Sequence, residues 1–164
     1  MVSPKRVHWI AMKHVLRYIQ GTMDFGLDYV RGGGVKLVGN TDSDWVGSVA
    51  DRKSTSGCCF GLGSAVVSWL SRKQKSVALI SSEAEYMATI QANCEAIWLR
   101  KILHGLFDLE LGHTVIHCDN QSCIKLTENP VFHDRTKHIG IKYHFIRDWV
   151  QKGVVKLEYV STDE

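Results

Sequence analysis

Two hydrophobic periodicities alternate along the sequence, and their order restricts the fold more than any single motif does. Alternating apolar and polar residues predict five strands, at residues 35–45, 56–63, 65–71, 113–119 and 154–160. Apolar residues at helical spacing predict helices at 5–19, at 82–107, in a short stretch before Asn129–Pro130, and at 138–151. Three strands thus precede the long helix, and single strands alternate with helices after it. This order predicts an α/β fold whose mixed sheet, antiparallel in its first three strands and parallel afterwards, carries helices on both faces.

The long helix also contains a pattern that predicts which of its sides faces the sheet. Its large apolar residues recur at helical spacing and are expected to point inward: Met87, Ile90, Cys94, Ile97, Trp98, Ile102 and Leu106. The same spacing in the last helix predicts inward positions for Ile139, Tyr143, Ile146, Trp149 and Val150.

A run of three glycines at 32–34 is the best linker candidate in the chain. We therefore expect the main domain to span residues 32–164 and the helix at 5–19 to belong to a separate segment, residues 1–31. The chain has 164 residues, which is enough for one domain with a hydrophobic core.

Composition excludes several classes of protein. The formal charge of +3 permits a nucleic-acid partner without demanding one. No apolar run reaches the roughly 18 residues that span a bilayer, and the string MVSPKRVHWIAMK lacks the apolar core of a signal peptide, so we expect an intracellular protein without a membrane partner. The five cysteines are odd in number and form no CxxC, which favours reduced thiols. The spacings of His133, His138 and His144 do not match two zinc ligands on one helical face.

Carboxylates occur where three predicted elements begin or end. Asp42 and Asp119 lie at or near the ends of strands, and Glu85 lies in the first turn of the long helix. If the two strands are parallel neighbours, the three groups converge, and their mutual repulsion is relieved by divalent cations. Carboxylate oxygens suit Mg²⁺, and two such ions about 4 Å apart can catalyse phosphodiester cleavage.

Each of these acids also has a purely structural interpretation. Glu85 fits a capping box with Ser82, Asp119 fits a helix N-cap, and Asp42 fits a turn. Taken singly, the structural interpretation is the better one, and taken together the two interpretations balance. Spacing alone does not choose between Asp42 and Asp44, which share one face of a strand, or between Glu85 and its neighbour at position 83.

Several strings carry a resemblance to a known family. They are TDSDWVG, DRKSTSG, SSEAEYMA, WLRKIL, CDNQSCIKL, ENPVFHDRTKHI and YHFIRDWV. Together they resemble the ribonuclease H region of copia-type LTR retrotransposon Pol polyproteins, over nearly the whole chain. The first 22 residues resemble the stretch that joins the reverse transcriptase to ribonuclease H in those polyproteins, which makes residues 1–31 a connector. Trp9 and Ile10 on that connector are then expected to be exposed.

The resemblance implies a ribonuclease H-like fold and assigns roles by matching positions. The catalytic, metal-binding carboxylates it implies are Asp42, Glu85 and Asp119. Residues implied to approach the substrate are Ser81, Ser82, Asn120 and Gln121. The implied activity is two-metal hydrolysis of the RNA strand of RNA–DNA hybrids during reverse transcription, with Mg²⁺ or possibly Mn²⁺ as cofactor. The implied partners are the hybrid and the reverse transcriptase domain, inside a cytoplasmic virus-like particle.

Three basic clusters are candidates for contacts with substrate phosphates. They are Arg52-Lys53, Arg72-Lys73 with Lys75, and Arg135 with Lys137 and His138. Each cluster alone is better explained as a solvated surface. The third ranks first, because it precedes a helix whose backbone N–H groups also favour phosphate. Recognition of hybrid shape and of the 2′-hydroxyl predicts no base specificity.

The chain departs from the family in two places. Gly140 stands where the family has an acid, which costs up to about 1 kcal/mol of helix preference. The family also continues beyond STDE into a helix with a fourth carboxylate, in an ADxxTK-like string, so we expect the final helix of the domain to be missing. Two alternatives therefore stay open: a catalytically dead remnant that only binds nucleic acid, and a zinc-dependent module.

Overall fold

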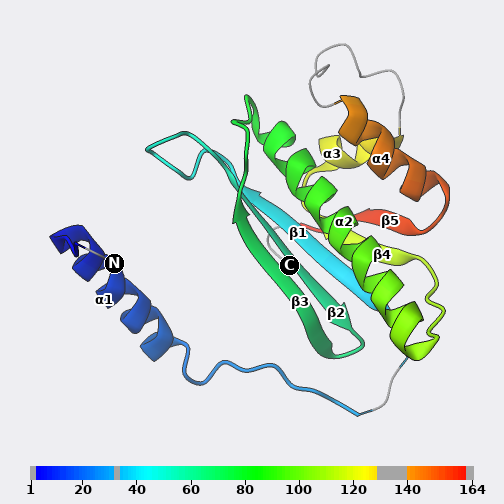
Figure 1. The fold of residues 1–164 in the computed structure, drawn as a ribbon, viewed down its shortest axis with the longest axis horizontal. Helices are drawn as coiled ribbons and strands as arrows, with labels where there is room; N and C mark the ends of the chain where they lie inside the picture. Colours follow the sequence, from blue (N-terminus) through cyan, green and yellow to red (C-terminus); the bar gives the residue numbers. More distant parts are fainter. Residues whose placement is uncertain (1–2, 32–33, 129–139, 162–164) are drawn as a thin grey trace.

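The fold is built around one five-stranded mixed sheet, in a computed structural model that describes residues 3–31, 34–128 and 140–161 (Figure 1). The strands are β1 (Leu37–Asp44), β2 (Thr55–Leu62), β3 (Ala65–Lys73), β4 (Thr114–Cys118) and β5 (Val155–Tyr159). Their order across the sheet is β3-β2-β1-β4-β5. The first three strands pair antiparallel, whereas β4 runs parallel to both β1 and β5. The predicted mixed sheet is confirmed.

The hairpin of β2 and β3 turns where the sequence predicted it. Leu62 pairs with Ala65 across the turn, and Gly63 has a φ of +62°, a left-handed conformation that glycine adopts without strain. The register shifts between Phe60 and Gly61, so a bulge lies just before the turn.

The long helix α2 (Ser81–Phe107) covers the sheet with small residues. Ala88, Ala92 and Ala96 have no exposed surface, whereas Trp98 is 53 % exposed and Leu106 72 % exposed. The predicted inward stripe is therefore wrong for Cys94, Trp98 and Leu106, because alanines let the helix backbone approach the sheet closely while these larger side chains lie beside the contact. Of that stripe, Ile97 is buried, Met87, Ile90 and Ile102 are partly buried, and Cys94 is exposed.

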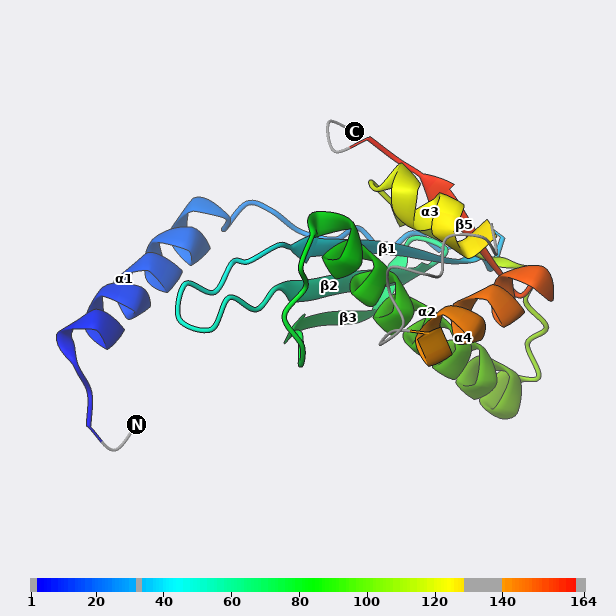
Figure 2. The same cartoon turned by 90° about the horizontal axis from the view of Figure 1, so that it is seen from above.

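The other helices of the domain are α3 (Gln121–Glu128) and α4 (Gly140–Gln151). Ile124 of α3 and Trp149 of α4 pack against the same core cluster as α2 and the inward residues of the strands, such as Phe60 and Ile116. Figure 2 shows these helices gathered along the sheet. Within the described residues, α2, α3 and α4 thus form the predicted helix layer on one face of the sheet.

Only part of the predicted inward face of α4 can be examined. Ile146 is fully buried, and Trp149 and Val150 are partly buried, as predicted. Ile139 and the side chain of Tyr143 lie outside the described residues. Among the helices that the structure describes, none is both long and apolar enough to cross a membrane.

The first helix, α1 (Arg6–Gly21), has no buried residue and stands apart from the sheet (Figure 1). Trp9 is 62 % exposed and Ile10 is 45 % exposed, which confirms the predicted exposed apolar surface. The chain meets the domain again at Val30, whose backbone N–H donates a hydrogen bond to Ser64 Oγ at 2.9 Å.

All five cysteines are free thiols, as predicted. Cys58, Cys118 and Cys123 are buried, and Cys94 is exposed. His133, His138 and the side chain of His144 lie outside the described residues, so the structure does not test the sequence argument against a histidine-ligated zinc site.

Candidate active site

The parallel pairing of β1 and β4 brings two of the predicted acids to one edge of the sheet. Thr41 is the register partner of Cys118, so Asp42 and Asp119 follow on neighbouring strands. Both acids line a cavity of about 190 Å³. The other residues that line this cavity are Asn40, Thr41, His117, Cys118, Val160 and Ser161.

Glu85 reaches the same place from α2. Its side chain is only 7 % exposed, and its Oε1 accepts a hydrogen bond of 2.7 Å from Ser43 Oγ. Its other oxygen, Oε2, is buried and has no hydrogen-bond partner. A buried carboxylate oxygen without a partner is costly, so this atom is suited to meet a cation or a water molecule.

The pKa of Glu85 is raised from its ordinary 4.5 to about 7, mainly by burial and also by the nearby charges of Asp119 and Asp42, while the hydrogen bond from Ser43 opposes the shift. Ser43 also donates its backbone N–H to Asp42 Oδ1 at 2.7 Å. Ser43 therefore links two of the three acids and fixes their orientation.

Neighbouring residues, rather than the three acids, make the capping bonds that the structural interpretations assigned to the acids. Helix α2 begins after Ile80, which has no side-chain capping bond, so Ser82 and Glu85 do not form a capping box. Glu83 binds the backbone entering the helix instead, because its Oε2 accepts the Leu79 N–H at 2.7 Å. Of the two glutamates, the one at position 85 faces the other acids.

The helix cap near Asp119 is likewise made by another residue. Asn120 Oδ1 accepts the backbone N–H of Cys123 at 3.0 Å, which is the N-cap bond of α3. Asp42 lies within β1 rather than in a turn. The carboxylate of Asp44 lies over the backbone of Gly47, where an added Cβ would be 1.8 Å from Asp44 Oδ2, and Asp44 does not line the cavity.

The donor atoms gathered here fit a hard divalent cation. The ligand atoms of Glu85, Cys118 and Asp119 lie within 4.8 Å of one another, and Asp42 lines the adjoining cavity. Three carboxylates and the unsatisfied Glu85 Oε2 form the oxygen-rich surroundings in which Mg²⁺ is bound by a few protein ligands and completes its shell with water or phosphate.

The structure brings together only some of the predicted substrate-binding residues. Ser81 and Ser82 are exposed or partly exposed in the first turn of α2, one turn before Glu85. Gln121 is exposed at the start of α3, whereas the side-chain oxygen of Asn120 is engaged in the helix cap. The predicted phosphate-binding residues Arg135, Lys137 and His138 lie outside the described residues.

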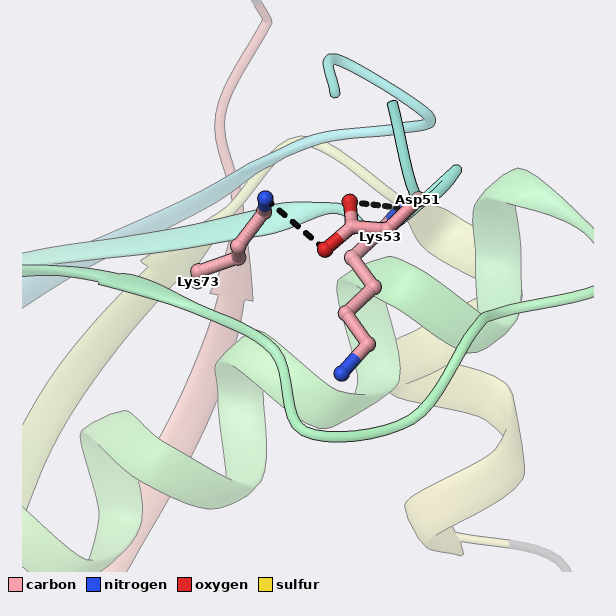
Figure 3. A network of polar contacts seen from close by, with 3 residues as sticks. All are labelled: Asp51, Lys53 and Lys73. Carbon is pink, nitrogen blue, oxygen red and sulfur yellow. Dashed lines mark hydrogen bonds and ion pairs between the residues drawn. The ribbon is translucent and has the colours of Figure 1, made fainter. Parts of the chain in front are cut away.

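Lys73 of the second basic cluster forms an ion pair with Asp51, in the loop that also carries Arg52 and Lys53 (Figure 3). Lys73 Nζ lies 2.9 Å from Asp51 Oδ2, and the backbone N–H of Lys53 donates to Asp51 Oδ1 at 3.3 Å. Hydrogen bonds from Ser48 and Lys73 lower the pKa of Asp51 from 3.8 to about 2. The charge of Lys73 is therefore partly compensated within the chain, which weakens it as a phosphate contact.

Three residues of the site were missed from the sequence. Ser43 orients Glu85, Cys118 lies within the ligand cluster, and His117 lines the cavity with its Nδ1 buried and without a hydrogen-bond partner. Strand alternation would have indicated the first two, because Ser43 and Cys118 follow Thr41 and Ile116 on the face toward α2.

Comparison with known proteins gives relatives that match this chain over its whole length or nearly all of it. The chain is 42 % identical over 165 residues to the retrovirus-related Pol polyprotein from transposon RE2 of Arabidopsis thaliana, and 41 % identical over 162 residues to that from transposon TNT 1-94 of Nicotiana tabacum. These matches cover 100 % and 99 % of this chain, which spans only 11 % and 12 % of the two polyproteins.

A shorter relative has a different name. The chain is 53 % identical over 97 residues to secreted RxLR effector protein 161 of Plasmopara viticola, a match that covers 59 % of this chain and 68 % of that protein. Because the transposon matches cover the whole chain or nearly all of it, this shared segment falls almost entirely within Pol-like sequence. No family model matches the chain.

Solved structures share the fold at low sequence identity. The N-terminal RNase H domain of rv2228c from Mycobacterium tuberculosis superposes with a TM-score of 0.55 at 14 % identity, covering 80 % of this chain and 86 % of that one. LC11-RNase H1 in complex with an RNA/DNA hybrid superposes with a TM-score of 0.53 at 14 % identity, covering 78 % and 87 %. The likeness shows that the five-stranded sheet and its helices form an RNase H-like fold.

Proposed function

The chain belongs to the retrovirus-related Pol polyproteins of transposons, and we propose that it is their ribonuclease H domain, which hydrolyses the RNA strand of RNA–DNA hybrids with two Mg²⁺ ions. One observation carries the proposal. Asp42 and Asp119 lie at the ends of neighbouring parallel strands and line one cavity, and their charges raise the pKa of Glu85 on α2, whose Oε2 is buried without a hydrogen-bond partner. Mn²⁺ has the same preference for oxygen ligands and is expected to substitute for Mg²⁺.

Each acid has a separate task in this proposal. Asp42 and Asp119, at the mouth of the cavity, would hold ions at the surface that the substrate approaches, and Glu85 would hold them from the buried side. When bound, two such ions activate a water molecule and stabilise the leaving oxygen of the phosphodiester. Ser43 keeps Glu85 Oε1 occupied, so that Oε2 points toward the ion site.

The raised pKa of Glu85 has a consequence for cation binding. Near neutral pH without a cation, a substantial share of Glu85 is protonated, so ion binding must release that proton. Binding and hydrolysis should therefore weaken below about pH 7, the pKa of this group.

The substrate surface extends from the acids along the starts of α2 and α3. In this proposal, Ser81 and Ser82 in the first turn of α2 contact the groove of the hybrid, and Gln121 at the start of α3 contacts its backbone. Polar contacts of this kind read backbone and 2′-hydroxyl groups rather than bases. We further propose that the reverse transcriptase domain of the same polyprotein is the partner of the exposed apolar side of α1, within a cytoplasmic particle.

The test is cleavage of a labelled RNA–DNA hybrid with Mg²⁺, with single-stranded RNA and duplex DNA as substrate controls. Asp42→Asn should abolish hybrid-specific cleavage, whereas Asp44→Asn, two residues along the same strand, should retain it. Equal loss in both variants would contradict the site. Hybrid binding without cleavage in the unaltered chain would contradict the activity and favour the binding-only alternative.

A further inference from the structure

The cluster of ligand atoms in the site contains a sulfur that the proposed reaction does not use. Cys118 Sγ lies with the carboxylate oxygens of Glu85 and Asp119, all within 4.8 Å of one another. Cys118 is also among the residues that line the cavity of about 190 Å³ that Asp42 and Asp119 share. The ligand atoms in tetrahedral zinc sites lie about 3.6 Å apart, as expected from Zn–S and Zn–O bonds of about 2.3 and 2.1 Å, so small side-chain adjustments would complete the set.

A second observation points to a cation at the same position. Glu85, a member of the ligand cluster, is 7 % exposed, and its Oε2 is buried without a hydrogen-bond partner. The Cys118 thiol shares a hydrogen bond with the Cys123 thiol, and it lies 4.0 Å from Thr89 Oγ1 and 3.9 Å from the carbonyl oxygen of Asn120. Hydrogen bonds to sulfur are weak, so these contacts would not hold the thiol strongly against a metal ion.

We propose that Cys118, together with Glu85 and Asp119, forms a site for a thiophilic divalent cation, Zn²⁺ or Cd²⁺, that overlaps the proposed Mg²⁺ site. The inference rests on the proposed function for its consequence, because the two kinds of ion share two carboxylates and exclude each other. Binding forms a metal–sulfur bond and releases the thiol proton to water. Mg²⁺ gains nothing from the sulfur, whereas Zn²⁺ and Cd²⁺ prefer it. Micromolar zinc would therefore displace the catalytic ions and inhibit cleavage.

The direct measurement is metal binding rather than activity. Cd²⁺ titration followed by the ultraviolet thiolate-to-metal band should give a band in the unaltered chain that Cys118→Ser removes. Cys94→Ser is the matched control, because Cys94 is an exposed thiol on α2 outside the cluster, and this variant should keep the band. The Zn²⁺ dissociation constant should rise at least about tenfold in Cys118→Ser.

Zinc X-ray absorption of the Cys94→Ser protein gives an answer even if Cys118→Ser does not fold. One sulfur at about 2.3 Å supports the site, and a shell of oxygen and nitrogen alone overturns it. Mn²⁺ binding, measured by electron paramagnetic resonance, separates the two proposals. Mn²⁺ binding without a zinc–sulfur bond overturns this inference alone, and a chain that binds neither Mn²⁺ nor Zn²⁺ overturns both.

Discussion

Helices α1 and α2 differ in which of their side chains are buried. α1 has large apolar side chains such as Trp9 and Ile10, yet none of its residues is buried. α2 buries small and polar residues such as Ala92 and Glu85, while its own Trp98 is 53 % exposed. In this chain, closeness to the sheet rather than side-chain hydrophobicity determines burial. The helix that approaches most closely is also the one that places an acid in the site.

The largest expected effect comes from removing the carboxylate that α2 buries. Glu85→Gln should lower hybrid cleavage and Mn²⁺ affinity by more than about 100-fold, because loss of a direct ligand should exceed the ten- to hundredfold effect of altering the groups around the ligands. Glu83→Gln is the matched control on the same helix. It removes the charge but leaves an oxygen that can still accept the Leu79 N–H, so it should cost no more than about 1 kcal/mol of unfolding free energy and change cleavage only a few-fold. Equal effects of the two variants would contradict the assignment.

The same buried acid should give the metal-free protein a distinct pH dependence. The pKa of Glu85 is about 7 in the folded protein and an ordinary 4.5 in the unfolded chain, so Glu85 binds more protons when the protein is folded. Its contribution to the free energy of unfolding therefore falls as pH rises between these two values. The fall is at most about 3 kcal/mol. Asp42, Asp119 and Ser43 face this group, and Glu85→Gln should remove the slope. Urea unfolding at pH 5, 6, 7 and 8 in EDTA compares the two proteins, and parallel pH profiles would refute the prediction.

Close packing of α2 predicts a smaller effect that separates its two sides. Ala92→Leu should lower the unfolding free energy by about 1–3 kcal/mol, since Ala92 has no exposed surface and lies in the core cluster. Cys94→Leu, two residues later on the exposed side, should change it by less than about 0.5 kcal/mol. Chemical unfolding measures both, and an equal cost at both positions would mean that α2 does not contact the sheet as described.

The smallest effect is expected at α1. Deleting residues 1–24, which keeps the contact between Val30 and Ser64, should change the unfolding free energy of the domain by less than about 0.5 kcal/mol, because α1 buries nothing. The deletion should also leave Mn²⁺ binding unchanged. A loss of several kcal/mol would show that α1 packs on the domain, and the contrast between the two helices would disappear.

The order of elements followed from local patterns in the sequence, whereas the convergence of the acids was expected only on the condition that β1 and β4 are parallel neighbours. Strand alternation and turn residues placed the ends of β1 and β4, and the parallel pairing of these strands then brought Asp42 beside Asp119. The fold needed only period and order, because a mixed sheet accommodates such a series in few ways.

The choice between neighbouring acids could not be made from spacing. Asp42 and Asp44 alternate onto one face of β1, and what separates them is the path of the turn after β1, which brings Asp44 close to Gly47. Glu83 and Glu85 differ by the bond from the Leu79 N–H, which depends on the path of the chain before α2. The family resemblance chose between them where physical reasoning from the sequence did not. The inward face of α2 was misjudged because alanines contribute little to a hydrophobic pattern.

The parallel pairing of β1 with β4 has a consequence for the synthesis of the polyprotein. Strands β2 and β3 leave the ribosome directly after β1. The three strands can therefore form an antiparallel sheet from neighbouring sequence before β4 is translated. The strand before Asp119 emerges only after the whole of α2 has been translated. A nascent chain therefore has most of its sheet before it has an acidic pocket. The candidate metal site would be complete only after the ribosome has passed β4.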